Sequence, residues 1–195
     1  LWREASDEQI IFLNDDAMPT TPDWIAALLS FSVDDSVGGV GARLYYDDGS
    51  IQHVGMFPSF RTVVHAWLGW PTEAKTYNDW AFAQREWSVV TGAVFATRLS
   101  ILKQTNGFDE RFSLEFNDVD LCLRIRNLGY RIVYNPEAEF KHTEKASRGE
   151  TIPPGAEVAL FLSRWARWLD NDPASHPGLS KVRLDVVAEP ELKSW

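Results

Sequence analysis

Acidic side chains follow an apolar run near the front of the chain, and this pattern suits the chemistry of a divalent cation. Residues 10–13 are apolar, and Asn14, Asp15 and Asp16 come directly after them. An ionised carboxylate is costly to bury unless positive charge meets it, and oxygen ligands are what Mg²⁺ and Mn²⁺ prefer. A surface turn in which Asp and Asn side chains bond to the backbone explains the same residues. The residues alone leave both interpretations open.

A second acidic cluster, Asn117, Asp118 and Asp120, stands at the expected start of a helix. The helix dipole stabilises acidic side chains there by ~0.3–1 kcal/mol each, so a capping role explains the cluster fully. A carboxylate held beside a pocket is also well placed to act as a general base. Capping is the simpler interpretation when this cluster is considered alone.

Single polar residues at the ends of other apolar segments are weaker signals. His142 follows a short expected strand and precedes Arg148, whose guanidinium suits phosphate oxygens. Thr91 and Gly92 interrupt an apolar run, where a glycine admits either a close ligand or a bulge. His53 follows an expected hairpin turn, which favours a structural or supporting role.

The elements that must position these residues alternate between strand and helix. Residues 9–13 predict a short buried strand, and Thr21 predicts a helix start as an N-cap followed by Pro22. Residues 37–46 and 51–57 predict two strands joined by a tight turn. The three glycines within the first of these strands favour close backbone packing, because no helix follows them as a nucleotide-binding loop requires.

The middle of the chain is rich in tryptophan and has no clear period. Residues 57–87 predict a long, irregular functional loop with a little helix, and His65 within it belongs to no readable pattern. Residues 86–98 predict one apolar strand that continues past Gly92.

The second half of the chain has the clearest helical signals. The expected elements are a helix over 99–106 ended by Gly107, a helix over 117–128 ended by Gly129, a strand stopped by Pro136, a further strand in 138–142, and a helix over 155–169 with Arg164 and Arg167 away from its apolar face. Strands that alternate with helices indicate an α/β layer architecture.

Bulk composition excludes several classes of protein. The formal net charge of −9 argues against a nucleic-acid surface, which needs a basic excess. Cys122 is the single cysteine, which excludes an internal disulfide and a cysteine-built zinc site. No apolar run approaches the roughly 20 residues of a membrane-spanning helix, so a soluble, cytoplasmic protein is expected.

Taken in order, five segments resemble the inverting family 2 glycosyltransferases of the GT-A fold, and among them the rhamnosyltransferase-like members of bacterial surface-polysaccharide pathways. The segments are FLNDDA, VGARLYYDDGSIQHVG, VVTGAVFATR, GFDERFSLEFNDVDLCLRIRNLGYRIVYNPEAEFKHTEKASRG and DPASHPGLS. The resemblance implies an α/β fold with a mixed, Rossmann-like GT-A sheet flanked by helices. It also implies transfer of a sugar from a nucleoside-diphosphate sugar to a hydroxyl of a glycan or lipid-linked acceptor, with inversion.

The resemblance assigns a role to each polar cluster. Asn14, Asp15 and Asp16 occupy the position of the family's Asp-X-Asp motif, so Asp16 would bind Mg²⁺ or Mn²⁺ and Asp15 would lie near the sugar nucleotide. His142 would be the late metal ligand, and Arg148 would help to hold the diphosphate. Asn14 in place of the first aspartate reduces the charge that the motif offers to the metal.

The remaining implied roles concern the acceptor side of the reaction. Asp118 would be the base that deprotonates the acceptor hydroxyl, and Asp120 would be a second-choice base or a structural partner. The sugar or acceptor pocket would be lined by Thr91, Gly92, Asn117, Asp120 and Trp87.

The front of the chain departs from the family, because only thirteen residues precede Asn14. Family members begin with half of a nucleotide-binding sheet, so an incomplete GT-A domain is expected. We expect one domain over 1–195, with a helix and tail over 155–195, and little or no activity for the chain alone. An incomplete sheet also exposes an edge, which predicts cover by the chain's own ends or pairing between copies.

Two alternatives from other classes accompany this interpretation. One is a noncatalytic carbohydrate-interaction or assembly module that retains the fold. The other, a metal-dependent phosphoesterase or nucleotidyltransferase, needs more converging carboxylates than the chain offers. For a glycosyltransferase the expected partners are a sugar nucleotide and an acceptor, with peripheral association at the inner face of the cell membrane as a further expectation.

Overall fold

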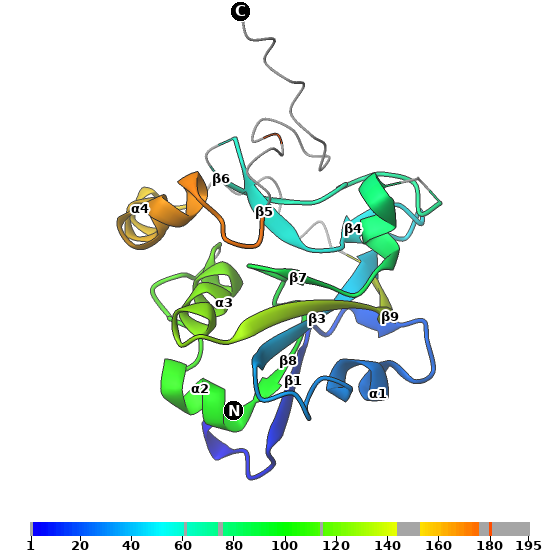
Figure 1. The fold of residues 1–195 in the computed structure, drawn as a ribbon, viewed down its shortest axis with the longest axis horizontal. Helices are drawn as coiled ribbons and strands as arrows, with labels where there is room; N and C mark the ends of the chain where they lie inside the picture. Colours follow the sequence, from blue (N-terminus) through cyan, green and yellow to red (C-terminus); the bar gives the residue numbers. More distant parts are fainter. Residues whose placement is uncertain are drawn as a thin grey trace, which may run out of the picture.

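The computed structural model describes residues 2–60, 62–73, 76–113, 115–143, 153–175 and 180. Within them the chain forms a mixed sheet with helices on both sides (Figure 1). The helical elements are η1 Trp2–Glu4, α1 Trp24–Leu29, η2 Tyr77–Phe82, α2 Leu99–Thr105, α3 Asn117–Asn127 and α4 Gly155–Asp170. The strands are β1 Gln9–Leu13, β2 Ala17–Pro19, β3 Val37–Tyr45, β4 Ile51–His53, β5 Met56–Ser59, β6 Thr62–His65, β7 Arg85–Trp87, β8 Val94–Arg98 and β9 Arg131–His142.

The main sheet has the strand order β1-β8-β3-β9-β2, with β4 attached to β3 and β7 attached to β9. Strands β3 and β9 run parallel, and the other pairs are antiparallel. Strands β5 and β6 form a separate hairpin. This arrangement confirms the expected mixed α/β sheet.

Successive side chains of the central strands point alternately into two apolar cores on opposite faces of the sheet. Val94 and Ala96 of β8 lie in the core beneath α1, whereas Phe95 between them belongs to the larger core with α2, α3 and α4. Figure 1 shows α1 on one side of the sheet and α2 and α3 on the other. Strand β3 is buried on both faces and is apolar except for Arg43, which pairs with Glu139 at 3.2 Å.

The glycines of β3 pack closely, as the sequence predicts. A Cβ atom on Gly39 would lie 2.5 Å from the ring of Phe95, and one on Gly41 would lie 2.6 Å from Val90. No side chain fits at these positions without displacement of the core.

The first helix is shorter than predicted. It begins at Trp24 with Asp23 as N-cap, and Thr21 does not cap it. Instead, Thr21 Oγ1 donates to the carbonyl of Glu137 and accepts from the amide of Glu139, at 3.2 Å each. Thr21 therefore fastens the chain to β9.

Two predicted strands and one predicted loop differ from the structure. Pro136 does not stop β9, which continues to His142 with a register shift relative to β3 where it passes the proline. The apolar segment 86–98 forms two strands, β7 and β8, separated by a turn that contains Gly92. The segment 57–87 is more regular than an irregular loop, since it holds most of the β5–β6 hairpin as well as η2 and β7.

Strand β1 is half-buried where the sequence predicts a buried strand. Its first four residues have intermediate exposure, and Leu13 is 44% exposed. Within the described ranges, β1 pairs with β8 alone and lies at the edge of the sheet. Its apolar sequence is therefore covered on only one side.

Helix α4 forms as predicted, and Arg164 is 25% exposed and ion-paired with two carboxylates. The guanidinium of Arg164 pairs with Asp120 and Asp109, at 2.7 and 2.8 Å. The apolar face of α4 contributes Phe161, Trp165 and other residues to the larger core.

Candidate functional site

The turn between β1 and β2 brings Asn14 and Asp16 against the last residue of β9. Ala17 of β2 pairs in register with His142. Asp16 Oδ1 lies 3.0 Å from His142 Nε2, and Asn14 Nδ2 lies 3.3 Å from the same nitrogen. The β2–β9 pairing thus joins the acidic turn to a histidine that is 128 residues away from Asn14 along the chain.

Gln52 of β4 fixes the orientation of His142. The amide nitrogen of Gln52 donates to the carbonyl of His142 at 3.3 Å, so its oxygen, Oε1, faces the ring nitrogen Nδ1 at 2.7 Å. An amide oxygen only accepts, and Nδ1 of His142 therefore carries a proton. The other nitrogen, Nε2, is the one that faces Asp16.

This orientation matches what a metal ligand requires. If Nε2 of His142 is unprotonated, its lone pair and the Asp16 carboxylate are two electron-pair donors side by side, and a cation between them relieves their repulsion. A histidine that ligates a metal through one nitrogen normally donates its other N–H to a neighbour, as His142 does to Gln52. No group of three or more His, Cys, Asp or Glu that could hold a metal ion occurs in the described residues, and Asp16 and His142 are a pair of such side chains.

Asp118 is held at the start of α3 by backbone groups. Its Oδ2 accepts from the amide of Gly92 at 2.9 Å, and its Oδ1 accepts from the amide of Val119 at 2.8 Å. The Asn117 side chain accepts from the amide of Asp118 at 2.7 Å. A Cβ atom on Gly92 would lie 3.2 Å from Cβ of Asp118, so a glycine suits this close approach.

One cavity of about 620 Å³ joins these groups. Both polar clusters border it, with Asn14 and His142 from one and Asn117 and Asp118 from the other. The further polar side chains and the glycine that line it are Tyr46, Gln52, His53, His65, Thr91, Gly92 and Glu115. The structure therefore brings both clusters, which are distant in sequence, to a single cavity, with Asp16 joined to it through His142.

Asp120 lies away from this cavity. Its side chain is fully buried and accepts from Arg124, Arg164 and the indole of Trp165, at 2.7–2.9 Å. Asp120 therefore holds α4 against α3. The sequence leaves two roles open for Asp120, a second-choice base or a structural partner, and this position favours the structural one. The acceptor contact implied for Asp120 is not supported by this position.

Three other implied site residues are not brought to the cavity by the described contacts. Trp87 is 1% exposed and packs against Phe57 and Trp80, so its ring cannot reach an acceptor. Asp15 is the exposed middle residue of the acidic turn and does not line the cavity. Arg148 lies outside the described residues.

Sequence reasoning missed Gln52 and His65 as parts of the site. His65 lies on β6, in a hairpin that the sequence of residues 57–87 does not predict. The residues around Gln52 predict a strand but give no sign that its side chain belongs to the site. Only the pairing of distant strands reveals either one.

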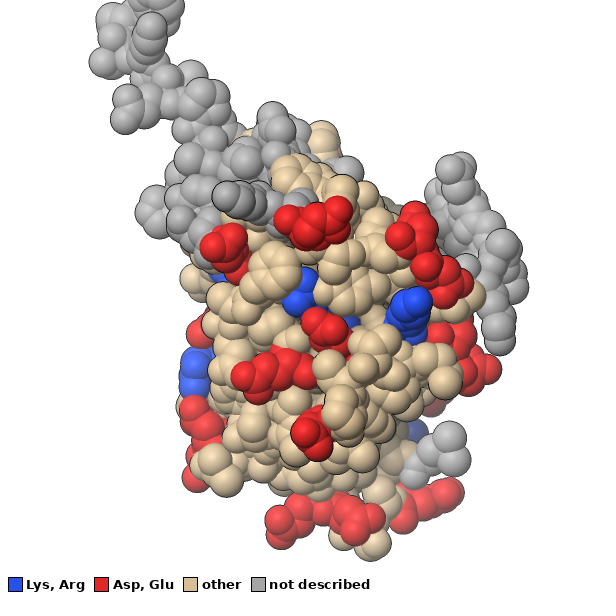
Figure 2. Space-filling model, turned by 90° about the vertical axis from the view of Figure 1, so that its right-hand side faces the viewer, with Lys and Arg blue, Asp and Glu red and all other residues tan. Residues whose placement is uncertain are grey.

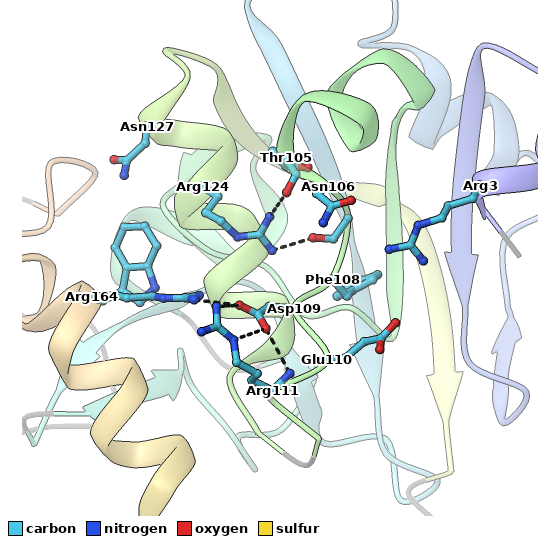
Figure 3. Close-up of a pocket in the computed structure, with 12 residues that line it drawn as sticks. Arg3, Thr105, Asn106, Phe108, Asp109, Glu110, Arg111, Arg124, Asn127 and Arg164 are labelled. Atoms are coloured by element: carbon cyan, nitrogen blue, oxygen red, sulfur yellow. Dashed lines mark hydrogen bonds and ion pairs between the residues drawn. The ribbon is translucent and has the colours of Figure 1, made fainter.

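A second cavity, of about 730 Å³, lies between α2, α3 and α4 and is rich in arginine (Figure 3). Its charges are largely paired within the protein. Asp109 accepts from both Arg111 and Arg164, and Arg124 donates to the carbonyls of Thr105 and Gly107. The hydrogen bond from Arg111 is the main cause that holds the pKa of Asp109 well below its usual range.

The comparisons with known proteins agree with this architecture. The model of the family described as "Glycosyltransferase like family 2" matches residues 2–171. The chain belongs to this glycosyltransferase family.

Its relatives are bacterial proteins of greater length. Protein y4gI of Sinorhizobium fredii is 34% identical over 94% of this chain and 21% of its own length. The O-antigen biosynthesis protein RfbC of Myxococcus xanthus is 30% identical over 94% of this chain and 15% of its own length. An N-acetylglucosaminyl-diphospho-decaprenol L-rhamnosyltransferase of Mycobacterium tuberculosis is 32% identical over 57% of this chain and 39% of its own length. The chain thus spans between about a seventh and two fifths of the lengths of these relatives.

A solved structure supports the GT-A fold. GalNAc-T7 with UDP, GalNAc and Mn²⁺ matches with a TM-score of 0.55 at 13% identity, over 89% of this chain and 41% of that chain. At that identity the likeness shows the fold alone. Within the described residues, no helix is long and apolar enough to cross a membrane.

Proposed function

We propose that the chain carries the metal and acceptor side of an inverting glycosyltransferase. The proposed reaction moves a sugar from a nucleoside-diphosphate sugar to a hydroxyl of a glycan or lipid-linked acceptor. The observation that carries the proposal is the single cavity bordered by both Asp118 and His142, with Asp16 paired to His142. The names of two relatives, a diphospho-decaprenol rhamnosyltransferase and an O-antigen protein, support L-rhamnose and a lipid-linked acceptor as the first choices.

The donor would be held at the acidic turn. Asp16 and the Nε2 atom of His142 would bind Mg²⁺ or Mn²⁺, with Gln52 keeping the ring in position. When bound, a divalent cation would offset the negative charge on the leaving diphosphate. The chain needs such help because it is acidic overall, and Asp and Glu predominate over Lys and Arg among the charged side chains on the face seen in Figure 2.

Asp118 would act as the base. The oxygen of the acceptor hydroxyl bonds to the anomeric carbon while the bond from that carbon to the diphosphate oxygen breaks. The hydroxyl proton passes to the Asp118 carboxylate, and the nucleoside diphosphate leaves with the electron pair. Both carboxylate oxygens already accept one backbone N–H, and each retains a second lone pair for the proton. One base and one displacement produce inversion without an enzyme nucleophile.

Metal-dependent nucleotide binding tests the donor half of the proposal. We expect Mn²⁺ with a nucleoside diphosphate (UDP, dTDP, GDP or CDP) to raise the melting temperature of the chain. The Asp16→Asn variant should lose this rise, because one of two protein ligands is gone. The matched control, Asp35→Asn, removes an equal charge from an exposed site outside the cavity and should keep it. No rise with any of the four nucleotides would favour the noncatalytic carbohydrate module.

Transfer itself tests the base. The transfer rate is measured on a longer version of the protein that also carries the nucleotide-binding half expected at its front, because little or no activity is expected of the chain alone. With a panel of nucleoside-diphosphate sugars that includes L-rhamnose, Asp118→Asn should lower this rate by ~10²–10⁴-fold, the usual contribution of a general base. The Mn²⁺-dependent rise in melting temperature should stay, because the metal ligands are untouched. An Asp118→Asn variant with the wild-type transfer rate would contradict the assignment.

A further inference from the structure

Two histidines from different strands meet on the wall of the cavity. Nδ1 of His53, on β4, lies 3.0 Å from Nδ1 of His65, on β6, with the rings nearly perpendicular. His53 is fully buried, and both residues line the cavity that Asp118 and His142 border. The function proposed above gives neither of them a role.

The hydrogen bonds decide which nitrogen of His53 carries its proton. The backbone amide of Thr91 lies 3.3 Å from Nε2 of His53, and a backbone N–H can only donate. Nε2 is therefore the unprotonated nitrogen. Burial, and then the charge of His65, lower the pKa of His53 well below its usual value, so the ring is neutral and its single proton is on Nδ1.

The same reasoning passes on to His65. Since Nδ1 of His53 is the donor, Nδ1 of His65 is the acceptor and carries no proton. A neutral imidazole must then carry its proton on Nε2. The His53–His65 pair thus holds His65 as a neutral Nε2–H donor, and a proton on its Nδ1 would break the chain of hydrogen bonds back to Thr91.

The pair is connected to the opposite side of the cavity through two successive backbone amides. The Thr91 amide is bound by His53, and the next amide, of Gly92, is bound by Asp118. His65 and Asp118 both border the cavity, and the covalent Thr91–Gly92 backbone joins the hydrogen bonds that hold them. A volume of about 620 Å³ is within the range of ligand pockets, about 300–1,000 Å³.

We propose that His65 is a sugar-binding residue, which donates its Nε2–H to an oxygen of a sugar bound over Thr91 and Gly92, and that His53 is the positioning residue that sets its tautomer. The proposal rests on the function proposed above and adds a contact to the sugar ring. A neutral donor on one side and the Asp118 carboxylate on the other suit a hydroxylated ring, since sugar hydroxyls both accept and donate. The sugar can belong to the donor or to the acceptor, and the test separates the two.

The tautomers are tested first, without any ligand. In ¹⁵N-histidine NMR spectra with long-range couplings, His53 should show a protonated Nδ1 and His65 a protonated Nε2. The opposite tautomer of His65, or an imidazolium at pH 7.5, would overturn the proposal.

Two variants of His65 then separate sugar binding from structure. His65→Asn places an amide oxygen near the position of Nδ1, which keeps an acceptor for His53 but removes the Nε2 donor. His65→Gln places an amide nitrogen near the position of Nε2, which keeps the donor. Loss of one hydrogen bond should weaken sugar binding about five- to tenfold in His65→Asn, and His65→Gln should stay within about threefold of the wild type.

Four probes complete the test: nucleoside-diphosphate L-rhamnose with Mn²⁺, the same nucleoside diphosphate without sugar, an alkyl N-acetylglucosaminide, and free L-rhamnose. The diphosphate alone should bind all variants equally, which a merely structural role of His65 would not allow. A loss confined to the sugar nucleotide and free L-rhamnose places the donor sugar at His65, and a loss confined to the glucosaminide places the acceptor there.

Failure of the inference differs from failure of the proposed function. If the sugar nucleotide binds with Mn²⁺ and both variants match the wild type for every sugar, His65 has no such contact and the proposed function stands. If no nucleotide binds at all, the proposed function fails, and the two sugars without a nucleotide still report on His65 through its ring signals. Unchanged ring signals with both of these sugars would overturn the inference as well.

Discussion

At the scale of single residues, hydrogen-bond direction rather than charge defines the site. Gln52 determines which nitrogen of His142 faces Asp16, and the amide of Thr91 determines which nitrogen of His53 is protonated. In both places a group that can act in only one sense orients an imidazole that can act in two. The cavity therefore has on its wall a His142 ring whose Nδ1–H is bound by Gln52 and, by the inference above, an N–H at His65.

His53 makes stability dependent on pH in a defined direction. Its pKa is lowered in the folded chain, so below the ordinary value of about 6.5 the unfolded chain binds a proton that the folded chain refuses. Its contribution to the free energy of unfolding is complete above that pH and is lost as the pH falls. The expected loss from this one group is at most about 1.4 kcal/mol per pH unit.

The measurement is urea unfolding of the wild type and of His53→Gln at pH 7.5, 6.5, 5.5 and 5.0. The variant should be less stable than the wild type at pH 7.5, because a buried hydrogen-bonded ring is lost. The gap should narrow as the pH falls, since the variant has no proton to refuse at this position. A gap that stays constant from pH 7.5 to 5.0 would contradict the assignment of a buried neutral His53.

At the scale of elements, α4 holds the loop before α3. Glu157, 3% exposed, accepts from the amide and hydroxyl of Ser113 at 2.9 and 2.7 Å, and from the amide of Glu115 at 3.1 Å. The ring of Phe116, just before Asn117, stacks on Phe161 of α4 at 4.3 Å. The position of the α3 start, and with it Asp118, therefore depends on a helix that follows it by some forty residues in sequence.

Glu157→Gln tests this dependence. The substitution replaces one acceptor oxygen by an NH₂ group that faces an N–H donor, so a buried donor is left without an acceptor. We expect the free energy of unfolding to fall by about 1–3 kcal/mol, as measured by urea unfolding. Glu110→Gln, the same change at an exposed carboxylate, is the control and should leave stability nearly unchanged. Equal stability of the two variants would mean that α4 does not hold this loop.

Local sequence signals predict elements better than they predict boundaries or the site. The helices at α2, α3 and α4 form where apolar period and a following glycine or polar residue predict them. Pro136 misleads because a register shift lets β9 pass it, and Gly92, which equally fits a bulge within one strand, lies instead in a turn between β7 and β8. The site needs pairing of β2 with β9 and of β4 with β3, which no short stretch of sequence encodes.

At the scale of the whole molecule, an acidic surface and an open sheet edge act in opposite directions. The net charge of −9 opposes contact between copies. In the part of the chain that the structure describes, β1 offers an edge with no further strand beside it, and unpaired strand groups at an edge are a template for pairing. Salt weakens the repulsion without affecting backbone hydrogen bonds, so association of the 195-residue chain should increase with ionic strength.

The hydrogen bonds of β1 identify a substitution that blocks its free edge alone. The amide of Asn14 donates to the carbonyl of Ala93, and the carbonyl of Glu8 accepts from the amide of Leu99. The even-numbered residues of β1 therefore bond to β8, and the N–H of Gln9 points away from it. Gln9→Pro removes only an outward N–H, whereas Gln9→Ala keeps it as the matched control. Sedimentation velocity at 0.5 M NaCl should show concentration-dependent dimers for the wild type and Gln9→Ala and monomers for Gln9→Pro. Dimers that persist in the proline variant would place the contact elsewhere, and monomers in all three would show that the edge of β1 does not pair.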